Sequence, residues 1–218
     1  MIENQFNRAV EKANNQLVVP HRVFAYAIYM LPLGNGQRLL SGAQGPLQRI
    51  VGGWETAWTV VAQSGQWFTP SFSGFDPSNT ATFGGRPDRI GNGNLSSGRS
   101  ISRWFDTGAF AIPGCPGTTP VCTNPANVGR FGNSGLNILS GPRIFNLDFA
   151  FIKSFVVREK TRLQFRMTMA NALNHPNFAN PRANISSRGT VGTINSQVRA
   201  LNGSPSPREI DLGLRLEF

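Results

Sequence analysis

Strict alternation at the end of the chain is the sequence feature that most constrains the fold. From position 209 onward, apolar residues alternate with polar or small ones as far as the last residue. Side chains along a strand point alternately to opposite faces, so this pattern predicts a strand over about 208–218 with one apolar and one polar face. The apolar positions are Ile210, Leu212, Leu214, Leu216 and Phe218.

Two neighbouring segments with the same period predict a hairpin. Over 144–156, apolar residues from Phe145 to Phe155 share one face, which Lys153 interrupts near its end. We expect this Lys to snorkel toward a headgroup boundary, because that costs less than burial at mid-depth. Over 162–172 the alternation continues and predicts the second strand of the pair.

Arginines mark the polar faces of these predicted strands. Arg162 and Arg166 lie on the polar side of one strand, and Arg215 lies on the polar side of the last. Such residues are unusual against a dry sandwich core and usual beside a water-filled or plugged lumen. Two interpretations stand: hydrated lumen residues, or contacts to plug acids or an anionic substrate.

Two earlier strands, over 21–31 and 53–66, are less regular and are separated by Gly and Pro turn residues. The stretches 67–142 and 174–207 are rich in Gly, Pro, Asn and Ser and only weakly periodic. Loops of this length are rare in compact soluble domains and are expected on the outer side of outer-membrane barrels. With the last residue in the periplasm, strand parity puts both long loops outside.

The predicted strand length matches a membrane. The segment from Phe145 to Phe155 spans roughly 24 Å of depth at a tilt near 40 to 45°, close to the ~25 Å apolar band of such barrels. We therefore expect an aromatic girdle at each end of the band. Its predicted members are Trp54, Trp67, Phe68, Phe145 and Phe155.

Five strands are too few to close a barrel, since the smallest bacterial barrels have about eight. An open edge in lipid leaves backbone groups unsatisfied, at several kcal/mol each. We therefore expect an all-β, incomplete antiparallel transmembrane barrel that obtains further strands upstream. The alternative is that 67–142 contains three short strands, for instance near 101–105 and 110–112.

Composition argues against several function classes. The net charge of +10 comes from scattered basic residues, so we expect no nucleic-acid partner. Neither His21 nor His175 belongs to a nucleophile arrangement with supporting spacing, so we expect no enzyme and interpret His175 as a turn residue. The spacings of a Ca²⁺ loop and of a zinc site are absent, so we predict no metal and no cofactor. Cys115 and Cys122 are close enough in sequence to form a local disulfide in an oxidising compartment.

Several segments resemble Oar-like TonB-dependent outer-membrane transporters, which carry a carboxypeptidase-regulatory-like domain ahead of plug and barrel. The most similar parts are 141–148 (GPRIFNLD), 171–178 (NALNHPNF) and the terminal strand. Similar segments upstream occur in the same order, so the resemblance covers nearly the whole chain. It implies that residues 1–218 are the C-terminal portion of one outer-membrane barrel domain with long extracellular loops.

The resemblance also implies function and partners. A family member takes up a large or scarce solute through a TonB complex that contacts the plug, and the terminal apolar residues are the signal read by the barrel-assembly machinery. This sequence begins without an export signal and lacks a plug, so we expect a truncated piece of an outer-membrane protein. Its expected partners are outer-membrane lipid and the missing N-terminal barrel and plug, and we expect no activity alone. The alternatives are a small structural or adhesive outer-membrane barrel, and a secreted β-sandwich binding module.

Overall fold

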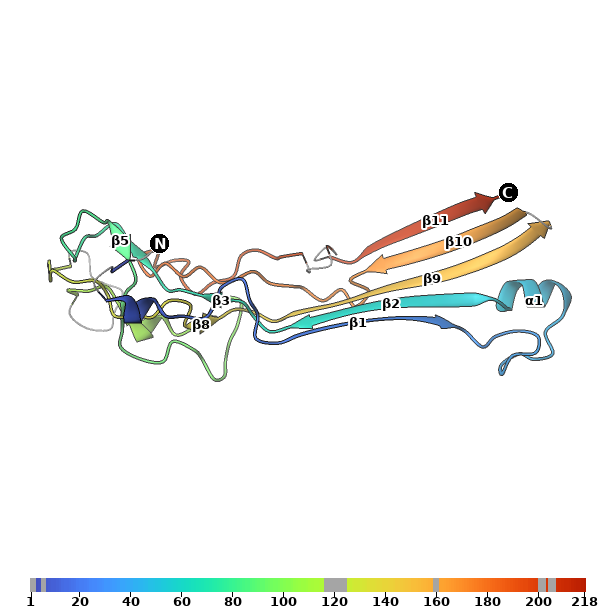
Figure 1. Ribbon diagram of the computed structural model, residues 1–218, viewed down its shortest axis with the longest axis horizontal. Helices are drawn as coiled ribbons and strands as arrows, with labels where there is room; N and C mark the ends of the chain where they lie inside the picture. The colour runs from blue at the N-terminus through green and yellow to red at the C-terminus, as the bar shows by residue number, and fades with distance from the viewer. Residues whose placement is uncertain (1–2, 5–6, 116–124, 159–160, 200–202, 204–206) are drawn as a thin grey trace. The chain divides into compact units, whose positions relative to one another are not determined.

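The computed structural model describes residues 3–4, 7–115, 125–158, 161–199, 203 and 207–218 (Figure 1). The chain divides into two compact units, each built from three segments. We call them the sheet unit and the loop unit. The sheet unit comprises Arg22–Gln63, Ile144–Asn177 and Gln197–Phe218, and the loop unit comprises Met1–His21, Ser64–Arg143 and Phe178–Ser196.

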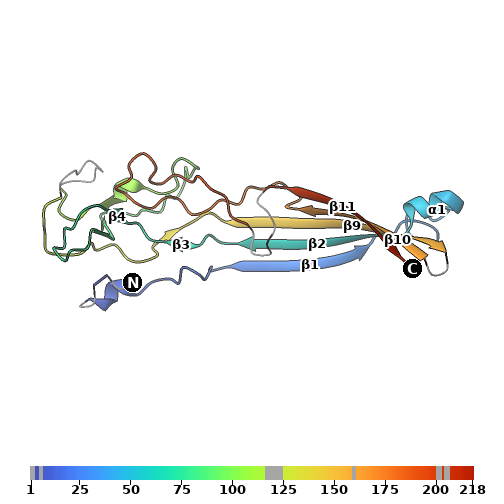
Figure 2. The same cartoon turned by 90° about the horizontal axis from the view of Figure 1, so that it is seen from above.

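The sheet unit is a five-stranded antiparallel sheet in the order β1-β2-β9-β10-β11, whose strands lie side by side in both views (Figures 1 and 2). Every strand bound falls within three residues of the range that the alternation predicts, and the all-β fold is confirmed. The strands are β1 Arg22–Met30, β2 Trp54–Gln63, β9 Ile144–Arg158, β10 Thr161–Ala170 and β11 Glu209–Glu217.

Cross-strand pairing puts the predicted apolar residues on one face. Trp54 is opposite Lys153, Lys153 is opposite Phe165, and Phe165 is opposite Leu214. Directly opposite residues point to the same side of a sheet, so this row belongs to a single face. The other face carries the arginines. Large apolar side chains also occur on this second face, on β1, for example Tyr26 opposite Thr59, and on β9, where Ile152 is opposite Arg166.

The sheet is open, because β1 and β11 are its two edges. The strands found in the loop unit do not join it. They are two residues long and pair with one another in three small separate sheets. A strand does occur within 110–112 and none covers 101–105, but no described strand of 67–142 joins the five-stranded sheet, so the alternative of barrel-completing strands there finds no support. These short strands are β3 Trp67–Phe68, β4 Phe72–Ser73, β5 Gly84–Gly85, β6 Asp88–Arg89, β7 Phe110–Ala111 and β8 Leu139–Ser140.

The connection between β1 and β2 contains a helix where turn residues alone were expected. Helix α1 spans Gly45–Val51, and Pro46 lies in its first turn, where a missing backbone N–H costs nothing. Gly45 has φ of +58°, which favours a residue without Cβ just before the helical run. The Gly-Pro pair therefore starts a helix here, and α1 lies at the same end of the sheet unit as the C-terminus (Figure 1).

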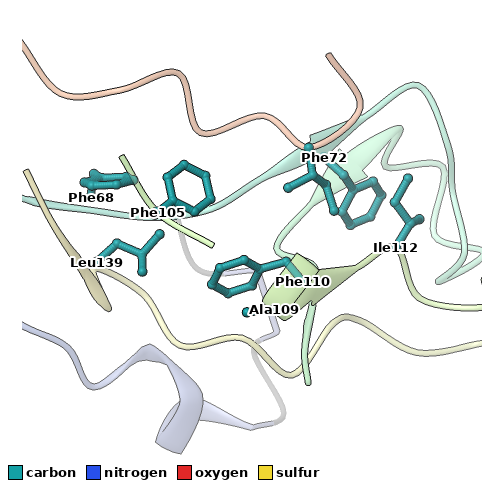
Figure 3. Packing of buried hydrophobic residues seen from close by; sticks show 8 residues of the cluster. Phe68, Phe72, Phe105, Ala109, Phe110, Ile112 and Leu139 are labelled. Atoms are coloured by element: carbon teal, nitrogen blue, oxygen red, sulfur yellow. The ribbon is translucent and has the colours of Figure 1, made fainter. Parts of the chain in front are cut away.

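The long loops form a hydrophobic core of their own (Figure 3). Phe105 is 1% exposed, and its ring meets those of Phe68 and Phe110 edge-on, with centroids 5.7 and 6.1 Å apart. A 3-10 helix, Thr107–Ala109, brings Ala109 into the same cluster. The loop unit is therefore a folded body. Its core residues are Phe68, Phe72, Phe105, Ala109, Phe110, Ile112, Leu139 and Ile185.

A buried arginine fastens the N-terminal segment to this unit. The Arg86 guanidinium donates to the carboxylates of Glu3 and Glu11 and, at 3.0 Å, to the Val10 carbonyl. Glu11 ends a short 3-10 helix, Arg8–Glu11, and Glu3 also accepts the Arg86 backbone N–H. Removing one partner of a buried ion pair leaves an uncompensated charge, which typically costs ~3–5 kcal/mol.

Truncation of Phe105 is expected to unfold the loop unit and leave the sheet assembled. A Phe105→Ala change removes a ring from the centre of the core, at a cost of about 3–5 kcal/mol. Limited proteolysis of the protein in isolated outer membranes should then cleave within the loop unit at much lower protease concentration. Phe83→Ala is the control, because Phe83 is 71% exposed. Equal protease resistance in both variants would contradict the core.

Neutralising Glu3 and Glu11 should restore part of the stability that the loop unit loses when Arg86 is replaced. The variant Arg86→Met leaves two buried carboxylates without their cation and should lower the thermal stability of the loop unit. The triple variant Arg86→Met, Glu3→Gln, Glu11→Gln should recover part of that loss, because no buried charge remains unpaired. Protease sensitivity measured at increasing temperature should give the stability order wild type, then the triple variant, then Arg86→Met. A triple variant less stable than Arg86→Met would show that the ion pair does not act as described.

Candidate functional site

The polar face of β10 and β11 gathers the three arginines that the alternation singled out. Arg162 is opposite Glu217, and Arg166 is opposite Gly213. Arg215 is opposite Gln164, between the levels of the other two. All three arginines are exposed, and the Arg215 Nε lies 3.3 Å from a Glu217 carboxylate oxygen. The three arginines thus lie at successive levels of one face, which also carries the carboxylates of Glu217 and Asp211.

An asparagine-rich turn fixes the opposite end of the same strands. The Asn171 side chain donates to the His175 carbonyl at 2.9 Å and accepts the His175 N–H at 3.0 Å. Its own N–H donates to the Asp148 carboxylate at 2.9 Å. Asn177 accepts the Phe145 N–H at 2.9 Å, so the turn also holds the start of β9. The segment 171–178 is therefore a structural cap, in which His175 takes part through its backbone N–H and carbonyl.

On the apolar face, most side chains of the three inner strands are half-buried by their neighbours, and those of the edge strands β1 and β11 are exposed. The Trp58 and Phe149 rings meet edge-on with centroids 4.6 Å apart, and Phe149 meets Phe151 at 4.4 Å. On β11 the apolar side chains have no second sheet above them, and Leu214 is 73% exposed. A continuous apolar face of this size indicates contact with something other than water. A sandwich would cover it with a second sheet, and in the described part of the chain no second sheet does so.

Comparison with known protein families decides whether this face contacts lipid or another protein layer. A family model described as an outer membrane β-barrel domain matches residues 1–210. The chain belongs to the outer membrane β-barrel domain family. A search of curated proteins and a search of solved structures found no match. In a member of this family, the apolar face of the sheet contacts lipid and the polar face lines the lumen.

Membership of the outer membrane β-barrel domain family places the protein in the outer membrane. The strand lengths of nine to fifteen residues are sufficient for spanning strands, which need about 9–11 residues when tilted. Among the described residues, no helix is long and apolar enough to span a membrane.

The predicted girdle residues divide between the two units. Trp54 and Phe155 lie on the lipid face near the β9–β10 hairpin. Phe145 lies on the same face at the opposite end of the sheet, where it is paired with Ala62. Trp67 and Phe68 belong to the loop unit. Phe68 is 5% exposed within the loop core, so the girdle prediction is wrong for this ring: its neighbours are Phe105 and Leu139 rather than lipid.

Lys153 satisfies its charge within the protein. Lys153 is 2% exposed, and its Nζ donates to the carbonyl of Gly52, which follows the last residue of α1. Nζ also lies 5.6 Å from the Trp54 ring centroid and 5.1 Å from that of Phe155. The predicted snorkelling to a headgroup is thus replaced by a backbone carbonyl and two aromatic faces, which the β1–β2 connection and the neighbouring strands supply.

Three carboxylates of the loop unit, those of Asp76, Asp88 and Asp106, have hydrogen-bond partners within the protein. Desolvation raises the pKa of Asp76, but hydrogen bonds from Ser78, Thr80 and Ala81 outweigh it and leave the pKa below its usual value. Asp88 accepts two hydrogen bonds of 2.7 Å from Arg130, which raise the pKa of that guanidinium. Asp106 caps the short helix at Gly108. Over the part of the chain that the structure describes, no three His, Cys, Asp or Glu residues gather as a metal group.

The predicted disulfide lies partly outside the described residues. Cys115 is described, packed beside the loop core, whereas Cys122 falls in 116–124 and is not. Pairing of Cys115 with Cys122 stays a prediction.

Substitution of Asn171 should weaken the cap in two separable steps. Asn171 has φ of +48°, which Gly tolerates and Ala does not. Asn171→Gly loses only the side-chain hydrogen bonds, whereas Asn171→Ala loses the bonds and adds roughly 1 kcal/mol or more of backbone strain. Thermal unfolding, followed by the heat-dependent shift of the barrel band in gels, should rank the wild type above Gly and Gly above Ala. Equal stability of all three would show that the cap contributes nothing.

Proposed function

We propose that the chain is the C-terminal barrel portion of an Oar-like TonB-dependent transporter that takes up a large or scarce solute. Membership of the outer membrane β-barrel family supports the barrel, and the resemblance over nearly the whole chain supports the transporter class. The observation that carries the proposal is the patch of Arg162, Arg166 and Arg215 on the lumen face.

The patch suits an anionic partner. Gly213 opposite Arg166 contributes no side chain, so the Arg166 guanidinium has open space beside it. Glu55 stands in the same row but is separated from Arg166 by Ile152. Guanidinium groups bind carboxylates and phosphates through paired hydrogen bonds. The positive patch would hold either acids of a plug or an anionic group of the solute, and both roles belong to uptake.

The partners follow from this proposal. The plug would contact the TonB complex, and this chain would contribute lumen wall and lipid face. The exposed edge of β11, with its apolar residues ending at Phe218, would be the segment that the barrel-assembly machinery recognises. Outer-membrane lipid would cover the apolar face, and no enzymatic step is involved.

Charge reversal at Arg166 tests the uptake role. In the complete barrel with its plug, Arg166→Glu should lower solute uptake at least tenfold, about 1.4 kcal/mol of lost interaction, without lowering barrel abundance. Arg158→Glu is the matched control, because Arg158 is exposed at the end of the β9–β10 hairpin. Uptake unchanged in Arg166→Glu, with normal abundance, would rule out the patch as part of the transport path.

A further inference from the structure

The β1–β2 connection folds back onto the lipid face of the sheet. Leu31 donates its N–H to the Trp54 carbonyl, and the Trp54 indole N–H donates to the Ile50 carbonyl at 3.0 Å. Lys153 holds the Gly52 carbonyl. Trp54 and Lys153 are opposite each other on the lipid face. Their hydrogen bonds to the Ile50 and Gly52 carbonyls therefore hold the C-terminal end of α1 against the surface that contacts lipid.

An apolar hollow lies beside this anchor. It measures about 380 Å³, within the ~300–1,000 Å³ typical of small-molecule sites. The Trp54 ring forms one wall and meets Phe151 and Phe165 edge-on, with centroids 6.3 and 6.5 Å away. Almost no polar atom faces the space, so it suits a hydrocarbon chain. Its lining consists of Leu31, Leu33, Trp54, Phe151, Phe165 and Met167.

The β1–β2 connection, which supplies Leu31 and Leu33 to the hollow, is both basic and apolar. Residues 31–53 include Arg38 and Arg49, both exposed, and contain no Asp or Glu. Four large apolar side chains of this connection are also exposed. Such a combination is typical of segments that lie in a membrane interface and attract anionic lipid. The four are Leu39, Leu40, Leu47 and Ile50.

We propose that this hollow binds one phospholipid of the periplasmic leaflet with an anionic headgroup. One acyl chain fills the space between Leu33 and Met167, and the phosphate lies within reach of Arg38 and Arg49. Lys153 is engaged by Gly52 and fixes the connection without contacting the lipid. The α1 connection is then an interfacial element that seats a structural lipid at the inner end of the barrel. The site depends on the membrane setting of the family and on no transported solute.

Native mass spectrometry of the protein purified from the outer membrane tests the site. The protein is washed in detergent micelles and then offered phosphatidylglycerol and phosphatidylethanolamine in equal amounts. The wild type should retain one phospholipid, preferring phosphatidylglycerol. Leu33→Trp fills the hollow and should weaken retention at least tenfold, about 1.4 kcal/mol or more. Leu39→Trp adds the same ring to the same connection outside the hollow and should retain lipid as the wild type does.

The headgroup preference has its own variant. Arg38→Gln with Arg49→Gln should remove the preference for phosphatidylglycerol and leave total phospholipid unchanged. Arg22→Gln with Arg143→Gln removes two exposed arginines elsewhere and should leave the preference intact. A wild-type protein that keeps no phospholipid overturns the proposal without any variant. Equal retention by Leu33→Trp overturns the hollow as the site, and a dimer mass lost in Leu33→Trp would assign the hollow to a second copy.

Discussion

Hydrogen bonding of the backbone is the constraint on which the rest of this protein depends. In hydrocarbon, every N–H and C=O must find a partner within protein, because water is not there to supply one. The five long strands meet this demand through β2, β9 and β10, each paired on both sides, while β1 and β11 each leave one row unpaired. Closure must therefore come from strands beyond these five, and the sheet is stable in lipid only as part of a larger ring.

Once the strands pair in register, the two faces follow from the alternation alone. The row of Trp54, Phe165 and Leu214 lies on the apolar face, which in this family contacts lipid, and Arg162, Arg166 and Arg215 lie on the opposite, polar face. A shift of one residue would exchange the faces and put guanidinium groups in lipid. The asparagine cap at 171–178 helps to prevent this shift, since it ties the end of β10 to the beginning of β9.

The elements that could be predicted are those whose signal is periodic and local. Strands β9, β10 and β11 fall into this class, because apolar and polar residues alternate along most of their length, whereas β1 and β2 alternate less regularly and are bounded by turn residues. The loop core could not be found this way, since its strands are two residues long and its aromatic residues are isolated among Gly and Pro. The partners of Arg86 are 83 and 75 residues away in sequence, which no local pattern encodes. Phe68 was assigned to lipid for the same reason: its burial depends on Phe105 and Leu139. Lys153 was expected to need a headgroup because its acceptor, Gly52, belongs to a connection read as turns.

The three segments of the loop unit all leave the sheet from one end, as the antiparallel order requires. The core formed by 64–143 is completed by Ile185 from the third segment, and Arg86 recruits Glu3 and Glu11 from the first. These contacts join residues separated by long stretches of chain, and such contacts form slowly. Folding of the loop unit must therefore come late, after the hairpins have brought their ends together. A compact loop unit would then be a sign that the strands of the sheet unit have already paired in the correct register.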